Sequence, residues 1–151
     1  MSTSLGAGVA CELCSGPGGR LVWSDEDWRV VRVADSEFPA FYRVIALEHV
    51  QEFSMLSGPQ RRRCMDLVCA VESTLLHVLT PRSINLAALG NVVPHLHWHV
   101  VARFEWDSHF PNPIWGPEKR RVRPSPAEHL SVDLAELDAA VTTSLSQCAA
   151  L

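Results

Sequence analysis

The sequence lacks three features that would point to particular classes of protein. No apolar run approaches the roughly 20 residues that cross a bilayer, which argues against a membrane-spanning helix. The 13 basic side chains are outnumbered by 17 acidic ones, for a formal net charge of -4, so broad electrostatic binding to nucleic acid is not expected. The N-terminus lacks the basic and then apolar layout of a secretory signal, and we expect a cytoplasmic protein whose anionic ligands are held by a local site.

The chain contains five cysteines, and a reducing compartment makes a disulfide framework an unfavourable interpretation. Cys11 and Cys14 are separated by two residues, a spacing typical of a metal or redox pair. Cys64 and Cys69 fall inside an apolar helical pattern, so we expect both to be core residues, because a free cysteine packs as a small hydrophobe.

Periodicity and turn signals predict one α+β domain. Its antiparallel sheet of about five strands is accompanied by one long helix and a short C-terminal helix. A capping box at Ser57 to Gln60 begins the long helix, and Thr80-Pro81 ends it. We expect a flexible leader at 1–10, the main domain at 11–116, and an extension at 117–151 that belongs to the same domain or to a dimer. The predicted strands are Arg20 to Trp23, Trp28 to Ala34, Phe41 to Leu47, Ser83 to Leu89 and His95 to Arg103, and the C-terminal helix is Ser131 to Leu145.

Three histidines alternate in the last predicted strand, at His95, His97 and His99. Alternate residues of a strand share one face, so the imidazoles should form a row. Same-face neighbours lie roughly 6.8 Å apart, whereas two nitrogens on one zinc ion lie at most about 4 Å apart. The row therefore suits an extended, anionic polyphosphate better than a metal held by all three histidines.

The motif His95-Leu96-His97-Trp98-His99-Val100-Val101 resembles that of the histidine triad (HIT) superfamily, and in particular its bacterial diadenosine polyphosphate hydrolase-like members. The loop Gly90-Asn91-Val92-Val93-Pro94 and the later Ile114-Trp115-Gly116 extend the resemblance, which covers roughly 11–116.

The resemblance implies a nucleotide hydrolase or transferase acting on dinucleoside polyphosphates or nucleoside phosphoramidates, without an organic cofactor. His97 would attack the α-phosphorus to give a nucleotidyl-histidine, and His99 would contact the transferring phosphate, with His95 as the third member of the catalytic row. A backbone carbonyl accepting the other ring proton of His97 would fix the reactive tautomer. The resemblance places four further residues at the substrate, namely Asn85, Gly90, Asn91 and Trp115.

The same resemblance implies a structural zinc site formed by Cys11, Cys14, His49 and His95, which would withdraw His95 from the row. A reduced thiol pair without metal is the alternative. HIT relatives also usually form two-fold dimers, so a homodimer is expected. Trp106, His109 and Trp115 follow the histidine strand, and their loop could either stack on a base or pack against a partner subunit.

Two departures from the family pattern leave alternatives open. Val92 replaces a serine or threonine whose hydroxyl commonly touches phosphate, and Pro39-Ala40-Phe41 replaces the more usual Pro-Gly-His. Neither removes the nucleophile. A nucleotide-binding regulatory module with little turnover therefore remains a second hypothesis, and a zinc-dependent scaffold without nucleotide affinity is a third.

Overall fold

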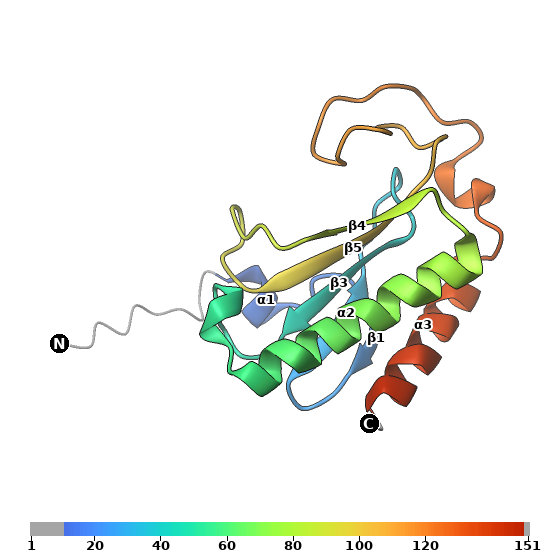
Figure 1. The fold of residues 1–151 in the computed structure, drawn as a ribbon. Coiled ribbons are helices and arrows are strands. Elements are labelled where there is room, and N and C mark those ends of the chain that lie inside the picture. The colour runs from blue at the N-terminus through green and yellow to red at the C-terminus, as the bar shows by residue number, and fades with distance from the viewer. Residues whose placement is uncertain (1–10, 150–151) are drawn as a thin grey trace.

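The computed structural model describes residues 11–149, so the expected leader at 1–10 lies outside the described residues. A five-stranded sheet with the order β1-β2-β3-β5-β4 forms its centre, and every neighbouring pair is antiparallel (Figure 1). The strands are β1 (Arg20–Ser24), β2 (Trp28–Arg32), β3 (Phe41–Ala46), β4 (Ser83–Ala87) and β5 (His97–Arg103). The helices are α1 (Glu12–Ser15), α2 (Gly58–Leu79) and α3 (Leu134–Ala149), with short 3-10 turns at η1 (Phe53–Met55) and η2 (Pro126–His129).

The long helix α2 begins and ends where the sequence predicts. The Ser57 hydroxyl accepts the backbone N–H of Gln60 at 3.3 Å, and the Gln60 side chain accepts the N–H of Ser57 at 2.8 Å. This reciprocal capping satisfies two donors that the first turn leaves free. Thr80 caps the other end with a left-handed φ of 44°, and Pro81 cannot continue the helix.

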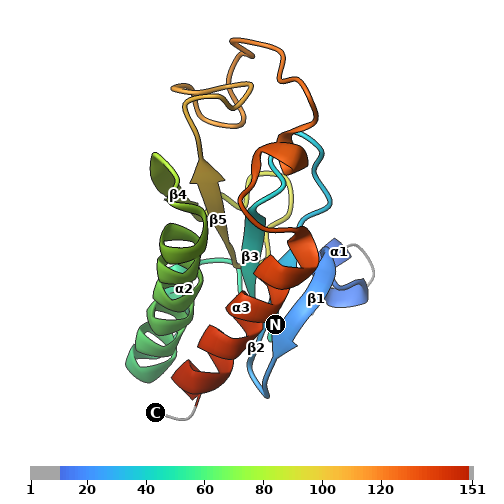
Figure 2. The same cartoon turned by 90° about the vertical axis from the view of Figure 1, so that its right-hand side faces the viewer.

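Both long helices cover the same face of the sheet, as the two perpendicular views show (Figures 1 and 2). Strand side chains alternate in direction, so one set from β2, β3 and β5 meets the helices and forms the main core. Its fully buried members include Val30, Val44 and Val100 from the strands, Val68, Val71 and Leu75 from α2, and Leu137, Val141 and Leu145 from α3. The other face of the sheet is left for shorter elements and loops.

A partly buried polar cluster joins α3 to the sheet. Asp138 on α3 accepts two hydrogen bonds from Arg32, at 2.9 and 3.1 Å, and one from the Tyr42 hydroxyl at 2.7 Å. Burial raises the pKa of Tyr42, and the hydrogen bond to Asp138 raises it further, so the hydroxyl stays protonated as a donor. The C-terminal helix therefore packs on the sheet through both apolar and polar contacts.

Two predictions about local structure are wrong. His95 and Leu96 precede β5, because the N–H of His95 bonds the carbonyl of Val93 and that of Leu96 bonds the carbonyl of Val50. Cys69 is exposed rather than part of the core. It lies about 100° around α2 from the buried Val68, outside the apolar stripe.

Among the described residues, no helix is both long and apolar enough to cross a membrane.

Candidate functional site

The face of the sheet opposite α2 and α3 carries Arg43 of β3 together with His97, His99 and Arg103 of β5. His99 lies between two cross-strand neighbours, Arg43 on β3 and Ala87 on β4. His97 is two residues earlier on the same strand, and the ring centroids of His97 and His99 are 4.8 Å apart. The expected row therefore exists for these two imidazoles, whereas His95 leaves it.

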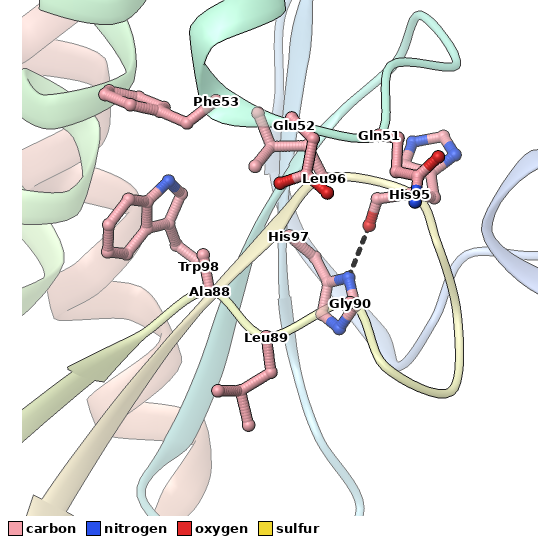
Figure 3. Close-up of a pocket in the computed structure, with 10 residues that line it drawn as sticks. All are labelled: Gln51, Glu52, Phe53, Ala88, Leu89, Gly90, His95, Leu96, His97 and Trp98. Carbon is pink, nitrogen blue, oxygen red and sulfur yellow. Dashed lines mark hydrogen bonds between the residues drawn. The ribbon is translucent and has the colours of Figure 1, made fainter.

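His97 has one ring nitrogen committed to the backbone. Its Nδ1 lies 2.5 Å from the carbonyl oxygen of His95 (Figure 3). A carbonyl can only accept, so Nδ1 carries the proton and Nε2 keeps a free lone pair. As expected, a backbone carbonyl fixes one tautomer of His97, with the proton on Nδ1.

Burial is the main cause of a lowered pKa at both imidazoles. At His97, burial and the positive charge of Arg43 lower the pKa, whereas the hydrogen bond to the backbone of His95 raises it. For His99, burial, His97 and Arg43 together lower the pKa to about 4. His99 is therefore neutral near pH 7, and the cationic neighbour Arg43 reinforces that state.

A cavity of about 470 Å³ opens over His97 and His99. Arg43 and Glu12 supply its charged side chains, and the loop after β4 forms one wall. Three of the predicted substrate contacts, Gly90, Asn91 and Trp115, line this cavity, and the Trp115 ring lies 5.0 Å from that of His99. A smaller hollow of about 210 Å³ adjoins His97 between Phe53, Trp98 and Gly90 (Figure 3).

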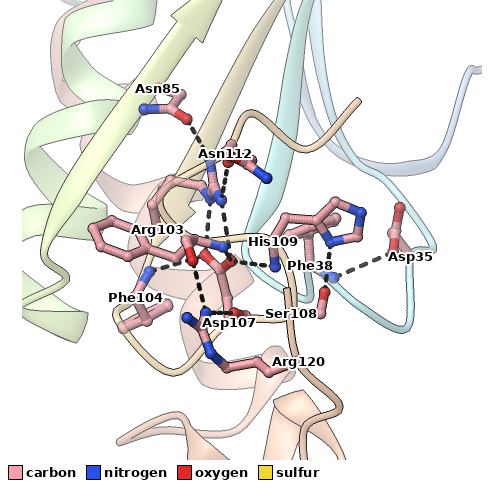
Figure 4. A network of polar contacts seen from close by, with 11 residues as sticks. Asp35, Phe38, Asn85, Arg103, Phe104, Asp107, Ser108, His109, Asn112 and Arg120 are labelled. Carbon is pink, nitrogen blue, oxygen red and sulfur yellow. Dashed lines mark hydrogen bonds and ion pairs between the residues drawn. The ribbon is translucent and has the colours of Figure 1, made fainter. Parts of the chain in front are cut away.

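Asn85, the fourth predicted substrate residue, lies outside both hollows. It shares the open face through its register with Val101, but its side-chain oxygen accepts a hydrogen bond from Arg103 Nη1 at 2.7 Å (Figure 4). Of the three aromatic residues proposed to cover a base, only Trp115 reaches the cavity. Trp106 instead stacks between Phe104 and His129, and His109 bonds Ser108.

Cys11, Cys14, His49 and His95 form a compact group that fits a metal ion. Their ligand atoms all lie within 4.8 Å of one another. The contacts of Cys14 Sγ with His49 and His95 are 3.2 and 3.5 Å, and the two Nδ1 atoms are 3.2 Å apart. Bonds of about 2.0–2.3 Å to a tetrahedral zinc give ligand separations of about 3.3–3.8 Å. Two thiols and two imidazoles are also a donor set that zinc prefers.

The orientation of His95 supports this grouping. Its Nε2 lies 2.6 Å from the carbonyl of Ala46 and must be the protonated nitrogen, which leaves the Nδ1 lone pair facing the cysteines. A backbone acceptor of this kind commonly orients a metal-binding histidine. Cys11 caps α1 and Cys14 lies within it, whereas His49 follows β3 and His95 precedes β5. A metal here would join three distant parts of the chain.

Two arginines in and near the site were not predicted from the sequence. Arg43 lines the cavity. Arg103 lies outside it and joins Asn85 of β4 to Asp107 and Asn112 of the loop that bears Trp115 (Figure 4). Each is a single arginine in an alternating strand, a pattern equally typical of a solvent-facing residue. The one feature that could have identified them as site residues is their position on the same face of the sheet as His97 and His99.

The fold and site define an α+β protein with an open sheet face, a histidine row and an adjoining metal-type cluster. The family described as HIT domain matches residues 18–106, which is more than half of the chain, and the protein belongs to this family. No curated protein matches.

Solved structures of HIT proteins share this fold. A histidine triad protein from Marinobacter aquaeolei has a TM-score of 0.70 at 22% identity, over 92% of this chain and 96% of that chain. One from Bradyrhizobium japonicum has a TM-score of 0.65 at 23% identity, over 87% and 90%. A zinc-bound histidine triad family protein from Mycobacterium smegmatis has a TM-score of 0.60 at 14% identity, over 95% and 98%. Family membership supports nucleotide-binding hydrolase or transferase activity in general.

Proposed function

We propose that the protein cleaves dinucleoside polyphosphates or nucleoside phosphoramidates at the α-phosphate, through a nucleotidyl group on His97. The observation that carries this proposal is the hydrogen bond from His97 Nδ1 to the carbonyl of His95. It leaves a neutral imidazole with its Nε2 lone pair free, which is the form of histidine that acts as a nucleophile.

The reaction then has two displacements. Nε2 of His97 forms a bond to the α-phosphorus as the bond from phosphorus to the leaving group breaks, and the leaving group departs with the electron pair. Water next attacks the same phosphorus, the nitrogen–phosphorus bond returns its electrons to Nε2, and nucleoside monophosphate and a proton are released. Dividing one displacement into two is the advantage of a covalent intermediate.

The neighbours of His97 would bind and orient the phosphate. His99 is buried beside it, and Asn91 lies on the cavity wall with an amide that can donate to a phosphate oxygen. Trp115 is 54% exposed at the cavity, where a base could stack on its ring.

A second candidate function is a nucleotide-binding module with little turnover. Val92 is 92% exposed and offers no hydroxyl to a phosphate. Phe41 stands where the family pattern has a histidine, and its ring lies 5.5 Å from His99, so this position adds no imidazole. Tight nucleotide binding with negligible hydrolysis of the bound nucleotide would favour this alternative.

We further propose that Cys11, Cys14, His49 and His95 hold a structural zinc ion. The donor set and the separations described above support it, and a zinc-bound relative has the same fold. Zinc would join α1 to the start of β5 and fix the carbonyl of His95 that orients His97. We also propose that the protein is a homodimer, for which sedimentation of the purified protein is the test. We propose a cytoplasmic location as well, which fractionation of cells that produce the protein tests.

The catalytic proposal is tested by nucleoside monophosphate release from a diadenosine polyphosphate and from an adenosine phosphoramidate. Wild-type protein should release AMP from at least one of them, and His97→Ala should lower the rate by roughly 1000-fold or more. His77→Ala is the matched control, because His77 is an exposed histidine on α2, and it should retain full activity. Unchanged turnover in His97→Ala would remove that residue from the mechanism.

A further inference from the structure

Arg43 borders the cavity, yet most of its hydrogen-bonding capacity is unused. A guanidinium has five N–H donors. Nη1 of Arg43 donates to the carbonyl of Gly18 at 3.1 Å, and no other hydrogen bond links its guanidinium to residues 11–149. Its Nε is inaccessible to solvent and has no partner among these residues. The guanidinium also lies over the ring of Phe41, 5.7 Å from its centroid. Its buried Nε still lacks an acceptor among residues 11–149, and burying an unpaired donor is unfavourable.

The position of Arg43 ties it to the histidine row. It is the direct cross-strand partner of His99, and side chains of opposed residues leave the sheet about 5 Å apart on the same face. Within the described residues, Arg43 takes part in no ion pair. The acidic side chain that shares the cavity with it is Glu12, which is exposed. Glu12 acts on Arg43 through its charge without forming an ion pair, so the guanidinium N–H groups beside His97 and His99 have no carboxylate partner among the described residues.

The ligand that matches these features is an anion with several acceptor oxygens. A guanidinium presents parallel N–H groups that suit a phosphate. Arg43 lines the same cavity as His97 and His99, and its register places it directly beside His99. We propose that Arg43 binds the transferring phosphate beside His99. This inference rests on the proposed nucleotide function and extends it to a specific phosphate-binding residue.

A purely structural role for Arg43 predicts different behaviour. The bond to Gly18 holds the segment before β1, where Gly18 has a left-handed φ of 82°. Loss of that contact alone would lower the melting temperature and weaken all ligands alike. Loss of a phosphate contact would instead weaken AMP and leave adenosine almost unaffected, because the two ligands differ only in the phosphate.

The experiment compares AMP and adenosine affinities by calorimetry for wild type, Arg43→Met and Arg43→Lys. Arg43→Met should weaken AMP by about 10- to 100-fold, as expected for a hydrogen bond to a charged group, and change adenosine affinity by less than about threefold. Arg43→Lys keeps the positive charge but lacks the paired N–H donors of a guanidinium, so an intermediate loss of AMP affinity is expected. It also serves as the second variant if Arg43→Met fails to fold. Arg62→Met, which removes an exposed arginine of α2, should bind AMP like wild type.

Turnover of the same preparations separates the two proposals. If wild type releases AMP and depends on His97, but Arg43→Met binds AMP normally or loses AMP and adenosine equally, the inference about Arg43 is overturned alone. If wild type shows no turnover, but Arg43→Met binds AMP more weakly than wild type and binds adenosine equally well, the inference stands and the catalytic proposal fails. Wild type that neither releases AMP from the two substrates nor binds AMP overturns both.

Discussion

Arg103 and Asp107 form a two-point ion pair that is almost completely buried. Arg103 Nε and Nη2 donate to the two carboxylate oxygens at 2.8 and 3.0 Å, and each side chain is only 2% exposed. The same carboxylate accepts the backbone N–H groups of Phe104, His109 and Phe110 (Figure 4). This pair therefore fixes the start of the loop that carries Trp115.

Asp107→Asn should lower the free energy of unfolding by about 3–5 kcal/mol at pH 7, because it leaves the Arg103 charge buried without a partner. Burial alone would raise the pKa of Asp107, but the hydrogen bonds and charge of Arg103 and the backbone donors outweigh burial and lower it. A lowered folded pKa stabilises the protein fully above the unfolded value of about 3.9. That stabilisation is lost as pH falls through the folded pKa.

The difference in unfolding free energy between wild type and Asp107→Asn should thus be constant from pH 5 to 7 and shrink below about pH 4. Urea denaturation across this range measures it. A difference that does not change below pH 4 would contradict the assignment of the ionised carboxylate as the stabilising form.

Tyr42→Phe should destabilise the protein by about 1.5–3 kcal/mol, the usual cost of losing a hydrogen bond to a charged group. The lost bond is the 2.7 Å contact of the hydroxyl with Asp138. Arg20→Ala is the control, because Arg20 contacts the same carboxylate at 3.5 Å but its side chain is 70% exposed, and exposed pairs contribute about 0–1 kcal/mol. Equal destabilisation by the two changes would argue against a buried anchor for α3.

Metal analysis of the purified protein should find one zinc ion per chain, held by the cluster of two cysteines and two histidines. Cys11→Ser should lose the metal, since zinc prefers thiolate ligands and Cys11 is one of the four donors. Cys69→Ser should keep it, because Cys69 is exposed on α2. Removal of zinc with a chelator should lower the melting temperature of wild type and of Cys69→Ser. A metal-free native protein would remove the zinc proposal.

Trp115→Ala distinguishes base stacking from subunit packing. If the ring stacks on a base, nucleotide affinity should fall by about 5- to 100-fold, in line with the effect of removing an aromatic platform, while the oligomeric state stays unchanged. Trp106→Ala should leave nucleotide affinity unaltered, since that ring lies between Phe104 and His129. A change of sedimentation behaviour with normal affinity would instead assign Trp115 to a subunit interface.

Local sequence patterns predict the architecture well because its elements follow local rules. The capping box at Ser57 and the apolar spacing along α2 depend on neighbouring residues only, and the strands alternate between core and open face. Cys69 is an exception. It lies within the helical segment but outside the apolar stripe, so the prediction that it is a core residue is wrong. The predicted start of β5 is wrong as well, because the strand begins at His97. The backbone N–H groups of His95 and Leu96 donate to the carbonyls of Val93 and Val50.

The site was harder to predict where it depends on long-range register. Alternation places His97 and His99 on one face of their strand. Nothing near Arg43 in the sequence shows that it lies opposite His99 on the neighbouring strand. The four residues of the metal cluster were expected from family resemblance, and the structure brings them together. Asn85 illustrates the reverse case, because its side chain bonds Arg103, an interaction that sequence spacing does not indicate.

Intact mass spectrometry of protein quenched during turnover shows whether His97 carries the nucleotidyl group. Wild type mixed with a diadenosine polyphosphate should show an added adenylyl mass that maps to His97 after proteolysis. The adduct should be absent in His97→Ala and present in His77→Ala. An adduct on another residue, or AMP release by His97→Ala at the wild-type rate, would show that His97 is not the nucleophile.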